Sequence, residues 1–305
     1  MPEFEDIGVD LMVQLSLIIP TLNEASNIDG LIAAIQRSMS SPELIDLNYE
    51  ILVVDDNSED ETVPTALAWG ESLPVRVIER RGKRDLSASV LEGVDRALGK
   101  WIVVMDADGS HPPSALPELV KPLLNNTADL VVGSRHVMGG ATVNWPWYRH
   151  VTSRLATWMA WPFTEVKDPM SGFFATSKEI IQCLPRSAAG YKILLELLVQ
   201  GGDQIRIQEI PIQFEDRQHG QSKLTHAQQI IYLKRLMNLG GGRVSKTTAQ
   251  RFLGVGLIGM VIDLSLFLLL AHWHAGLATA HMASFSVATL FNFSLNHRWS
   301  FRGSA

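Results

Sequence analysis

The stretch VVMDADGSHPP, residues 103–113, decides the fold and raises the question of function. Its two valines and methionine predict a buried strand, which ends on two carboxylates, Asp106 and Asp108. An ordinary turn would explain them, because aspartate bonds nearby backbone N–H groups and the following prolines end a strand. Hard carboxylate oxygens could equally hold a divalent cation, Mg²⁺ or Mn²⁺, against a diphosphate. The surrounding sequence has to decide between these two interpretations.

Short apolar runs alternate with helical patterns along the first 135 residues. The predicted strands are 14–20, 49–56, 75–79, 100–108 and 128–135, and the predicted helices are 27–39, 60–70 and 86–98. Continuous β-branched runs separated by helices indicate a mostly parallel sheet with helices on both faces. The predicted fold class is therefore α/β and Rossmann-like.

Polar segments follow most of the predicted strands at the point where each strand ends. PTLNEA (20–25) follows the first strand, DDNSED (55–60) the second and GSRH (133–136) the fifth. Open α/β sheets bind their ligands at the carboxyl edge of the strands. This regularity favours a ligand site over an isolated turn at Asp106 and Asp108.

Composition excludes several classes of protein. The 305 residues include 32 acidic and 26 basic side chains, so a generic nucleic-acid binder is not expected. The single cysteine, Cys183, cannot form an internal disulfide, which is consistent with a reducing compartment. The first ten residues, MPEFEDIGVD, have no basic region followed by an apolar core, so no signal peptide is expected.

The last fifth of the chain is apolar. Residues 252–273 are long enough, as a helix, to cross the hydrocarbon core, and a second apolar run at 277–295 follows after a short connection. Basic residues flank this hairpin, with Arg243, Lys246 and Arg251 before it and Arg298 and Arg302 after it. The positive-inside rule then predicts two spans with both ends in the cytoplasm.

Two further segments combine aromatic or apolar residues with basic ones. They are 145–163, which holds four of the eight tryptophans, and 224–240. Either segment could lie at a membrane interface, since tryptophan is apolar with one polar group, or could pack on the folded domain. Both interpretations stay open at this stage.

Eight ordered segments together resemble the dolichol-phosphate mannose synthases and their polyprenyl-phosphate relatives, which are inverting glycosyltransferases of the GT-A fold. The matching segments are IIPTLNE, VVDDNSEDET, RGK, DADGSHPP, VVGSR, DPMSGFF, GYKILLE and EIPIQFEDRQHGQSK. The tail resembles the first half of a GtrA-type membrane domain. The resemblance implies a GT-A domain at 1–223, an interfacial helix and linker at 224–247 and a transmembrane hairpin at 248–305.

The resemblance also implies a role for individual residues. The donor nucleotide sugar would be bound by Pro20, Leu22, Glu24, Val54, Asp56, Lys83, Asp106, Ala107, Asp108, Arg217 and Lys223. Metal ligation would fall to Asp106, Asp108 and Ser110, and binding of the acceptor phosphate to Arg135, Arg149 and Ser153. The catalytic set would be Asp106, Asp108, Arg135, Arg149 and Asp168. Asp168 could orient the sugar, act as a base, or merely cap the segment that follows it.

The expected reaction is transfer of a hexose to dolichyl or polyprenyl phosphate at the cytoplasmic face of a membrane, with Mg²⁺ or Mn²⁺. The favoured donor is GDP-mannose, and UDP-glucose is the alternative. The sequence departs from the family pattern at Ser110, where glutamine is usual, and in RDLSAS (84–89), where glycines are usual. It also has two predicted spans where four are general. These departures leave a second hypothesis, a weakly catalytic transporter or scaffold for lipid-linked sugars.

Overall fold

The computed structural model describes residues 12–143, 164–184, 193–201, 204–215, 246–273 and 276–295, together with residues 145, 150, 152–154, 157 and 160. The chain divides into two compact units, Met1–Tyr232 and Leu233–Ala305.

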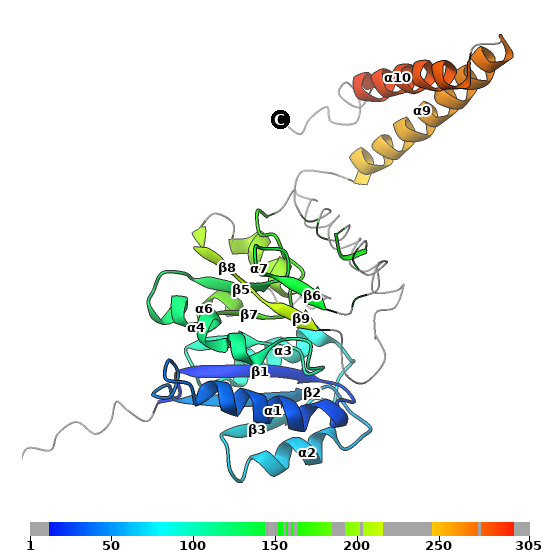
Figure 1. Cartoon of the computed structure of the whole chain (residues 1–305). Coiled ribbons are helices and arrows are strands. Elements are labelled where there is room, and N and C mark those ends of the chain that lie inside the picture. The colour runs from blue at the N-terminus through cyan, green and yellow to red at the C-terminus, as the bar shows by residue number, and fades with distance from the viewer. Residues whose placement is uncertain are drawn as a thin grey trace, which may run out of the picture. The chain divides into compact units, whose positions relative to one another are not determined.

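The first unit is built on a seven-stranded sheet with the order β3-β2-β1-β4-β7-β5-β8 (Figure 1). Its strands are β1 Leu15–Thr21, β2 Tyr49–Asp55, β3 Val75–Glu79, β4 Trp101–Val104, β5 Leu130–Ser134, β7 Phe174–Ser177 and β8 Ile207–Pro211. All neighbours pair in parallel except β7, which runs antiparallel to β4 and to β5. The mostly parallel α/β sheet predicted from the sequence is confirmed.

Helices cover both faces of this sheet, because successive strand residues point to opposite sides. On one face Leu17 and Ile19 pack in a core with α1 Ala25–Met39, α2 Thr62–Trp69 and α4 Leu116–Leu124. On the other face Ile18 packs in a second core with α3 Leu86–Arg96, α6 Lys178–Gln182 and α7 Ile193–Gly201. A short 3₁₀ helix, η1 Pro113–Ala115, precedes α4.

The fourth strand ends earlier than the sequence predicts. β4 stops at Val104, although the apolar pattern extends the strand to residue 108. The physical reason is that the backbone N–H of Asp106 donates to Nδ1 of His111, at 3.0 Å, instead of to a carbonyl of a neighbouring strand. The two carboxylates therefore lie in a turn just beyond the strand and not within it.

A small second sheet was not predicted. It pairs β6 Ala141–Val143 with β9 Gln213–Glu215 in parallel. Its register sets Thr142 opposite Phe214. Each strand has only three residues, too few for a recognisable alternation of apolar and polar side chains. The two strands are also 72 positions apart in sequence, so nothing local indicates that they pair.

The described residues of the second unit form two helices, α9 Lys246–His272 and α10 Leu277–Leu295. They pack along a seam of small buried residues, Val255, Ala280, Ser284 and Ala288. Asn292 lies directly against Gly259, where an added Cβ would meet its side-chain oxygen at 2.1 Å. Among the described residues one helical segment, Gly254–His272, is long and apolar enough to cross a membrane.

Candidate functional site

The two carboxylates lie in a tight turn at the carboxyl end of β4. Gly109 adopts φ +74°, a backbone region that glycine enters without strain, and so allows the chain to reverse direction. The hydroxyl of Ser110 donates to Asp108 Oδ1 at 2.5 Å, and the Ser110 N–H donates to the same oxygen at 3.1 Å. Ser110 thus orients the carboxylate of Asp108, whereas the side chain of Asp106 is 34 % exposed.

The segment 171–173 separates this turn from the end of β5. Gly172 lies against Asp106, because a Cβ on Gly172 would stand 2.8 Å from Asp106 Oδ2. On the other side, Ser171 Oγ donates to the carbonyl of Gly133 at 2.7 Å, and Gly133 N–H donates to the carbonyl of Phe173 at 2.9 Å. This segment therefore fixes the distance between the carboxylate turn and the arginine that follows β5.

That arginine, Arg135, is held by Asp168. The guanidinium donates from Nε to Oδ2 and from Nη2 to Oδ1, both at 2.7 Å, and the Arg135 backbone N–H donates to Oδ2 at 2.9 Å. Asp168 is fully buried. Burial alone would raise its pKa, but the hydrogen bonds and charge of Arg135 hold the pKa of Asp168 below its ordinary value. A carboxylate engaged in this way is an anchor for Arg135 and a poor proton acceptor.

Another buried carboxylate, Asp56, follows directly after the last residue of β2. Its Oδ1 is paired with Arg80, and its Oδ2 accepts the backbone N–H of Asp85 at 2.6 Å. Burial raises the pKa of Asp56, and these contacts only partly offset the effect. Asp85 also caps α3 by accepting the N–H of Ala88 at 2.9 Å. A capping aspartate therefore ends this loop in a regular helix start.

The loops after β1 and β2 are joined to each other. Asn23 and Asn57 both have positive φ, 52° and 64°, which asparagine tolerates better than most residues. Asn23 N–H donates to Ser58 Oγ at 2.8 Å, and Glu59 N–H donates to Asn23 Oδ1 at 2.8 Å. These cross-links make the two strand-end loops one rigid surface beside Asp56.

The remaining predicted donor residues lie along the same edge. Pro20 is at the end of β1, Glu24 is buried and accepts from Asn27 at 2.8 Å, and Lys83 is exposed. Leu22 is half-buried, and Ala107 is buried between the two carboxylates. Val54 is fully buried in the core beside α3, so only its main chain could face a nucleotide.

Part of the predicted site lies outside the described residues. This applies to Arg149, Arg217 and Lys223. Ser153 is helical and half-buried, and its predicted contact with an acceptor phosphate stays a prediction. Most of the segment 145–163 and all of 224–240 also fall outside the described residues, so their interfacial or core character stays open.

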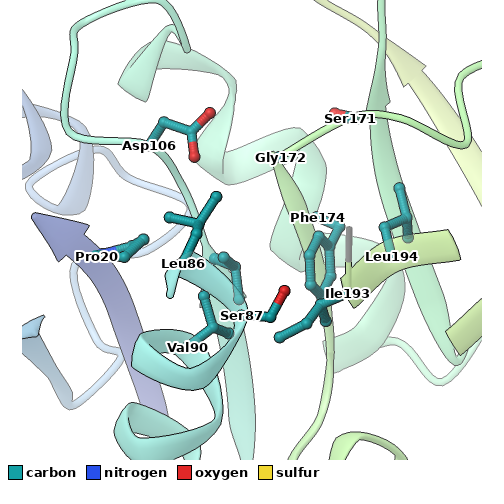
Figure 2. Close-up of a pocket in the computed structure, with 11 residues that line it drawn as sticks. Pro20, Leu86, Ser87, Val90, Asp106, Ser171, Gly172, Phe174, Ile193 and Leu194 are labelled. Atoms are coloured by element: carbon teal, nitrogen blue, oxygen red, sulfur yellow. The ribbon is translucent and has the colours of Figure 1, made fainter. Parts of the chain in front are cut away.

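A pocket of about 30 Å³ opens below Asp106 (Figure 2). Pro20 closes one side, the first turn of α3 contributes Leu86 and Ser87, and Phe174 lies opposite. The volume accommodates about one water-sized group. The pocket lies beside the segment 171–173, from which Ser171 and Gly172 line it together with Asp106.

The donor set fits a hard divalent cation. Asp106 and Asp108 offer carboxylate oxygens, the ligands that Mg²⁺ and Mn²⁺ prefer. Within the described part of the chain no group of three or more histidine, cysteine, aspartate or glutamate residues could hold a metal ion. The protein would therefore supply few ligands, and diphosphate oxygens and water would complete the shell, as is usual for Mg²⁺ with phosphate substrates.

Sequence reasoning missed three contributors to this site. Arg80 could not be distinguished from Arg81 in ERRGK, because only the fold aims one of them at Asp56. His111 follows the carboxylates with no sequence pattern that predicts a role, yet its Nδ1 accepts the backbone N–H of Asp106. Phe214 carried no signal, because its neighbours in space are far from it in sequence.

Comparison with known proteins gives two family matches. Residues 16–185 match the model described as Glycosyl transferase family 2, and residues 251–305 match the model described as GtrA/DPMS, transmembrane domain. A dolichol-phosphate mannosyltransferase of Pyrococcus furiosus is 35 % identical over 294 residues, which is 95 % of this chain and 82 % of the relative. The enzyme of that name from Saccharomyces cerevisiae is 38 % identical over 238 residues, covering 75 % of this chain and 88 % of the relative.

Solved structures share the fold. Glucosyl-3-phosphoglycerate synthase from Mycobacterium tuberculosis, in complex with phosphoglyceric acid, is 23 % identical with a TM-score of 0.58, covering 75 % of this chain and 80 % of that chain. The same enzyme in complex with Mn²⁺, uridine-diphosphate and phosphoglyceric acid is 25 % identical with a TM-score of 0.56, covering 75 % and 78 %.

Proposed function

The chain belongs to glycosyl transferase family 2 and carries a GtrA/DPMS transmembrane domain, and on this premise we propose that it transfers mannose from GDP-mannose to dolichyl or polyprenyl phosphate. The relatives that bear the name dolichol-phosphate mannosyltransferase are 35 to 38 % identical to it over most of its length. No nucleic acid takes part in this reaction.

The observation that carries the proposal is the arrangement around the segment 171–173. Gly172 touches the carboxylate of Asp106, and the neighbours of Gly172 hold the end of β5 immediately before Arg135. A donor diphosphate at Asp106 and an acceptor phosphate at Arg135 would therefore flank a sugar placed between them. Inversion needs this geometry, because the nucleophile approaches the anomeric carbon from the side opposite the leaving group.

The acceptor needs little activation. A phosphomonoester has its second pKa near 6, so the lipid phosphate is already an anion at neutral pH. The work left to the protein is to position the two substrates and to balance their charge. Arg135 suits the acceptor phosphate, because a planar guanidinium can donate two parallel hydrogen bonds to it.

A divalent cation at Asp106 and Asp108 would stabilise the charge that develops on the leaving diphosphate. Mn²⁺ accompanies the nucleotide in the crystal structure of the glucosyl-3-phosphoglycerate synthase, which supports a metal here without choosing between Mg²⁺ and Mn²⁺. Asp168 keeps Arg135 in place, and the lipid phosphate itself acts as the nucleophile. The base role considered for Asp168 is not part of this mechanism.

The nucleotide would lie on the joined loops after β1 and β2. Asp56, at the end of this surface, keeps a carboxylate close to where a base would bind, and its partner Arg80 fixes its orientation. A carboxylate accepts the ring N–H that guanine and uracil both carry. The choice of GDP-mannose over UDP-glucose therefore rests on the names of the relatives and needs a direct test.

The second unit would anchor the enzyme where its acceptor resides. We expect α9 and α10 to cross the membrane as two spans with both ends in the cytoplasm, because basic residues flank the hairpin and none occurs in its connection. An enzyme anchored in the membrane meets a lipid substrate of the same membrane at a raised effective concentration. The proposed domain limits stay 1–223, 224–247 and 248–305.

A donor screen on membranes that contain the full chain tests the proposal. We expect label from GDP-mannose, but not from UDP-glucose, to enter dolichyl phosphate in the presence of Mg²⁺ or Mn²⁺. Chelation of the metal should abolish the transfer. Transfer from UDP-glucose alone would correct the donor, and transfer from neither donor with either metal would overturn the proposal in favour of a transporter or scaffold.

A further inference from the structure

Phe214, on β9, lies between the two halves of the site. Its ring centroid is 5.1 Å from the guanidinium carbon of Arg135 and 5.3 Å from the ring centroid of His111, which it meets edge-on at 72°. It also meets the ring of Trp145 edge-on, at 5.5 Å. One half-buried side chain thus contacts both the residue that bonds Asp106 and the residue proposed to bind the acceptor.

On the donor side, β9 is attached to the carboxylate turn at two points. His111 is almost fully buried, accepts the N–H of Asp106 at 3.0 Å and stacks on Phe173 at 5.3 Å and 19°. The backbone N–H of Glu215, the residue after Phe214, donates to the carbonyl of Ser110 at 3.2 Å. A shift of β9 would therefore move both ends of the turn that carries Asp106.

On the acceptor side, the guanidinium of Arg135 is bounded on its edge and on its face. Asp168 takes two of its N–H groups, as described above. The aromatic rings of Phe214 and Trp145 lie within about 6 Å of the guanidinium carbon, at 5.1 and 5.5 Å, close enough for cation–π attraction. Asp168 fixes the direction in which the guanidinium points, and the two rings restrain the plane of the guanidinium.

We propose that Phe214 is a positioning residue that couples the donor-side turn, through His111, to the acceptor-side Arg135. Binding of each substrate then depends on the geometry of the other substrate's site as well as on its own. This inference rests on the proposed function for the meaning of the two sides. Packed side chains transmit such coupling only if disturbing one of them changes both sites. The consequence is that loss of the Phe214 ring weakens binding on both sides and slows transfer.

The test compares Phe214→Leu with Phe214→Tyr and with Tyr49→Leu in the full-length chain. Tyr49 is a matched control, because it is also a half-buried aromatic residue packed on the same core but lies at the start of β2. We expect Phe214→Leu to lower kcat about tenfold or more, since a small misplacement of reacting groups is costly. It should also raise both the KM for dolichyl phosphate and the Kd for GDP with Mn²⁺, measured by calorimetry. Phe214→Tyr should restore most of each value, and Tyr49→Leu should change none of them beyond twofold.

A double-mutant cycle separates coupling from general loosening. Combining Phe214→Leu with Arg135→Lys should cost less than the sum of the two single effects on kcat/KM, because both remove the same placement of the guanidinium. Additive effects, or a Phe214→Leu variant that matches Tyr49→Leu, would overturn the inference. If the leucine variant does not fold, Phe214→Met, whose flexible unbranched side chain fills irregular gaps without a ring, serves the same comparison. The Kd for GDP with Mn²⁺ is independent of transfer, so it tests the inference even if the proposed reaction fails.

Discussion

Adding one methyl group at Gly172 should displace the carboxylate of Asp106. A Cβ built there would stand 2.8 Å from Oδ2 and 3.1 Å from both Oδ1 and Cγ of Asp106. Ordinary contacts of a Cβ begin at 3.4 Å, so the nearest carboxylate oxygen has to withdraw from 2.8 to 3.4 Å, by about 0.6 Å. Gly172 is not among the glycines with positive φ, so the effect of Gly172→Ala is steric and not conformational.

The expected loss follows from where the carboxylate can go. Asp106 is tied through its backbone to His111, so its side chain has to rotate away from the segment 171–173. A misplacement of about 1 Å in a site of this kind costs roughly a hundredfold in rate, and a smaller one costs proportionately less. We therefore expect Gly172→Ala to lower kcat by about ten- to a hundredfold and to raise the Mn²⁺ concentration needed for half-maximal transfer. In calorimetric titrations, Mn²⁺ should raise the affinity of the variant for GDP less than it raises that of the native chain.

Gly30→Ala is the matched control, because a Cβ at Gly30 in α1 meets nothing within 4 Å. It should leave transfer and metal dependence unchanged, and alanine should slightly stabilise the helix. Native turnover and native metal dependence in Gly172→Ala would refute the reasoning. The same holds if both glycine variants lose activity in parallel with a fall in thermal stability.

Three further outcomes are expected. Asp106→Asn and Asp108→Asn should each lower transfer about a hundredfold or more in kinetic assays at saturating Mg²⁺ or Mn²⁺, and near-native turnover in both would exclude the metal assignment. Asp168→Asn should cost about 3–5 kcal/mol in thermal or denaturant unfolding, because it leaves Arg135 buried without its partner. Burial would raise the pKa of Asp168, but Arg135 holds it below its ordinary value of 3.8. The native chain should therefore exceed Asp168→Asn in unfolding free energy by the full amount above about pH 4, and this difference should vanish as the pH falls through the folded-state pKa of Asp168. A difference that is constant with pH would contradict the pairing. A chain ending at Arg243 should bind nucleotide sugar normally but transfer poorly to membrane-embedded acceptor, and equal activity of the two chains would show that the tail is not the anchor.

The sequence predicted the sheet because its signals are local. The runs that form β1, β2 and β3 are short and rich in apolar and β-branched residues, and their bounds in the structure lie within one residue of the prediction. The position of Asp106 and Asp108 at a strand end was predicted for the same reason. The exact end of β4 was not, because it depends on a side chain, His111, that competes for the Asp106 N–H. Apolar periodicity contains no information about that competition.

Contacts between distant residues account for what could not be predicted. Arg135 and Asp168 are 33 positions apart, and Arg80 and Asp56 are 24 apart. A charged residue in a loop has many possible partners, and only the completed sheet brings one of them within reach. Phe214 is the extreme case, since its contacts with His111 and Arg135 depend on β9, which is three residues long.

The pairing of Arg135 with Asp168 has a consequence for catalysis as well as for the fold. A guanidinium has five N–H groups, and Asp168 takes two of them, so three are left for an acceptor phosphate. Because the pair as a whole is neutral, a phosphate that binds it gains directed hydrogen bonds with little excess positive charge. Transfer converts a phosphate dianion to a phosphodiester with one charge fewer, and a neutral pair retains that product only weakly. If Arg135 binds the acceptor phosphate as proposed, Asp168 would orient the arginine for the incoming phosphate and would also limit the attraction that slows release of the product.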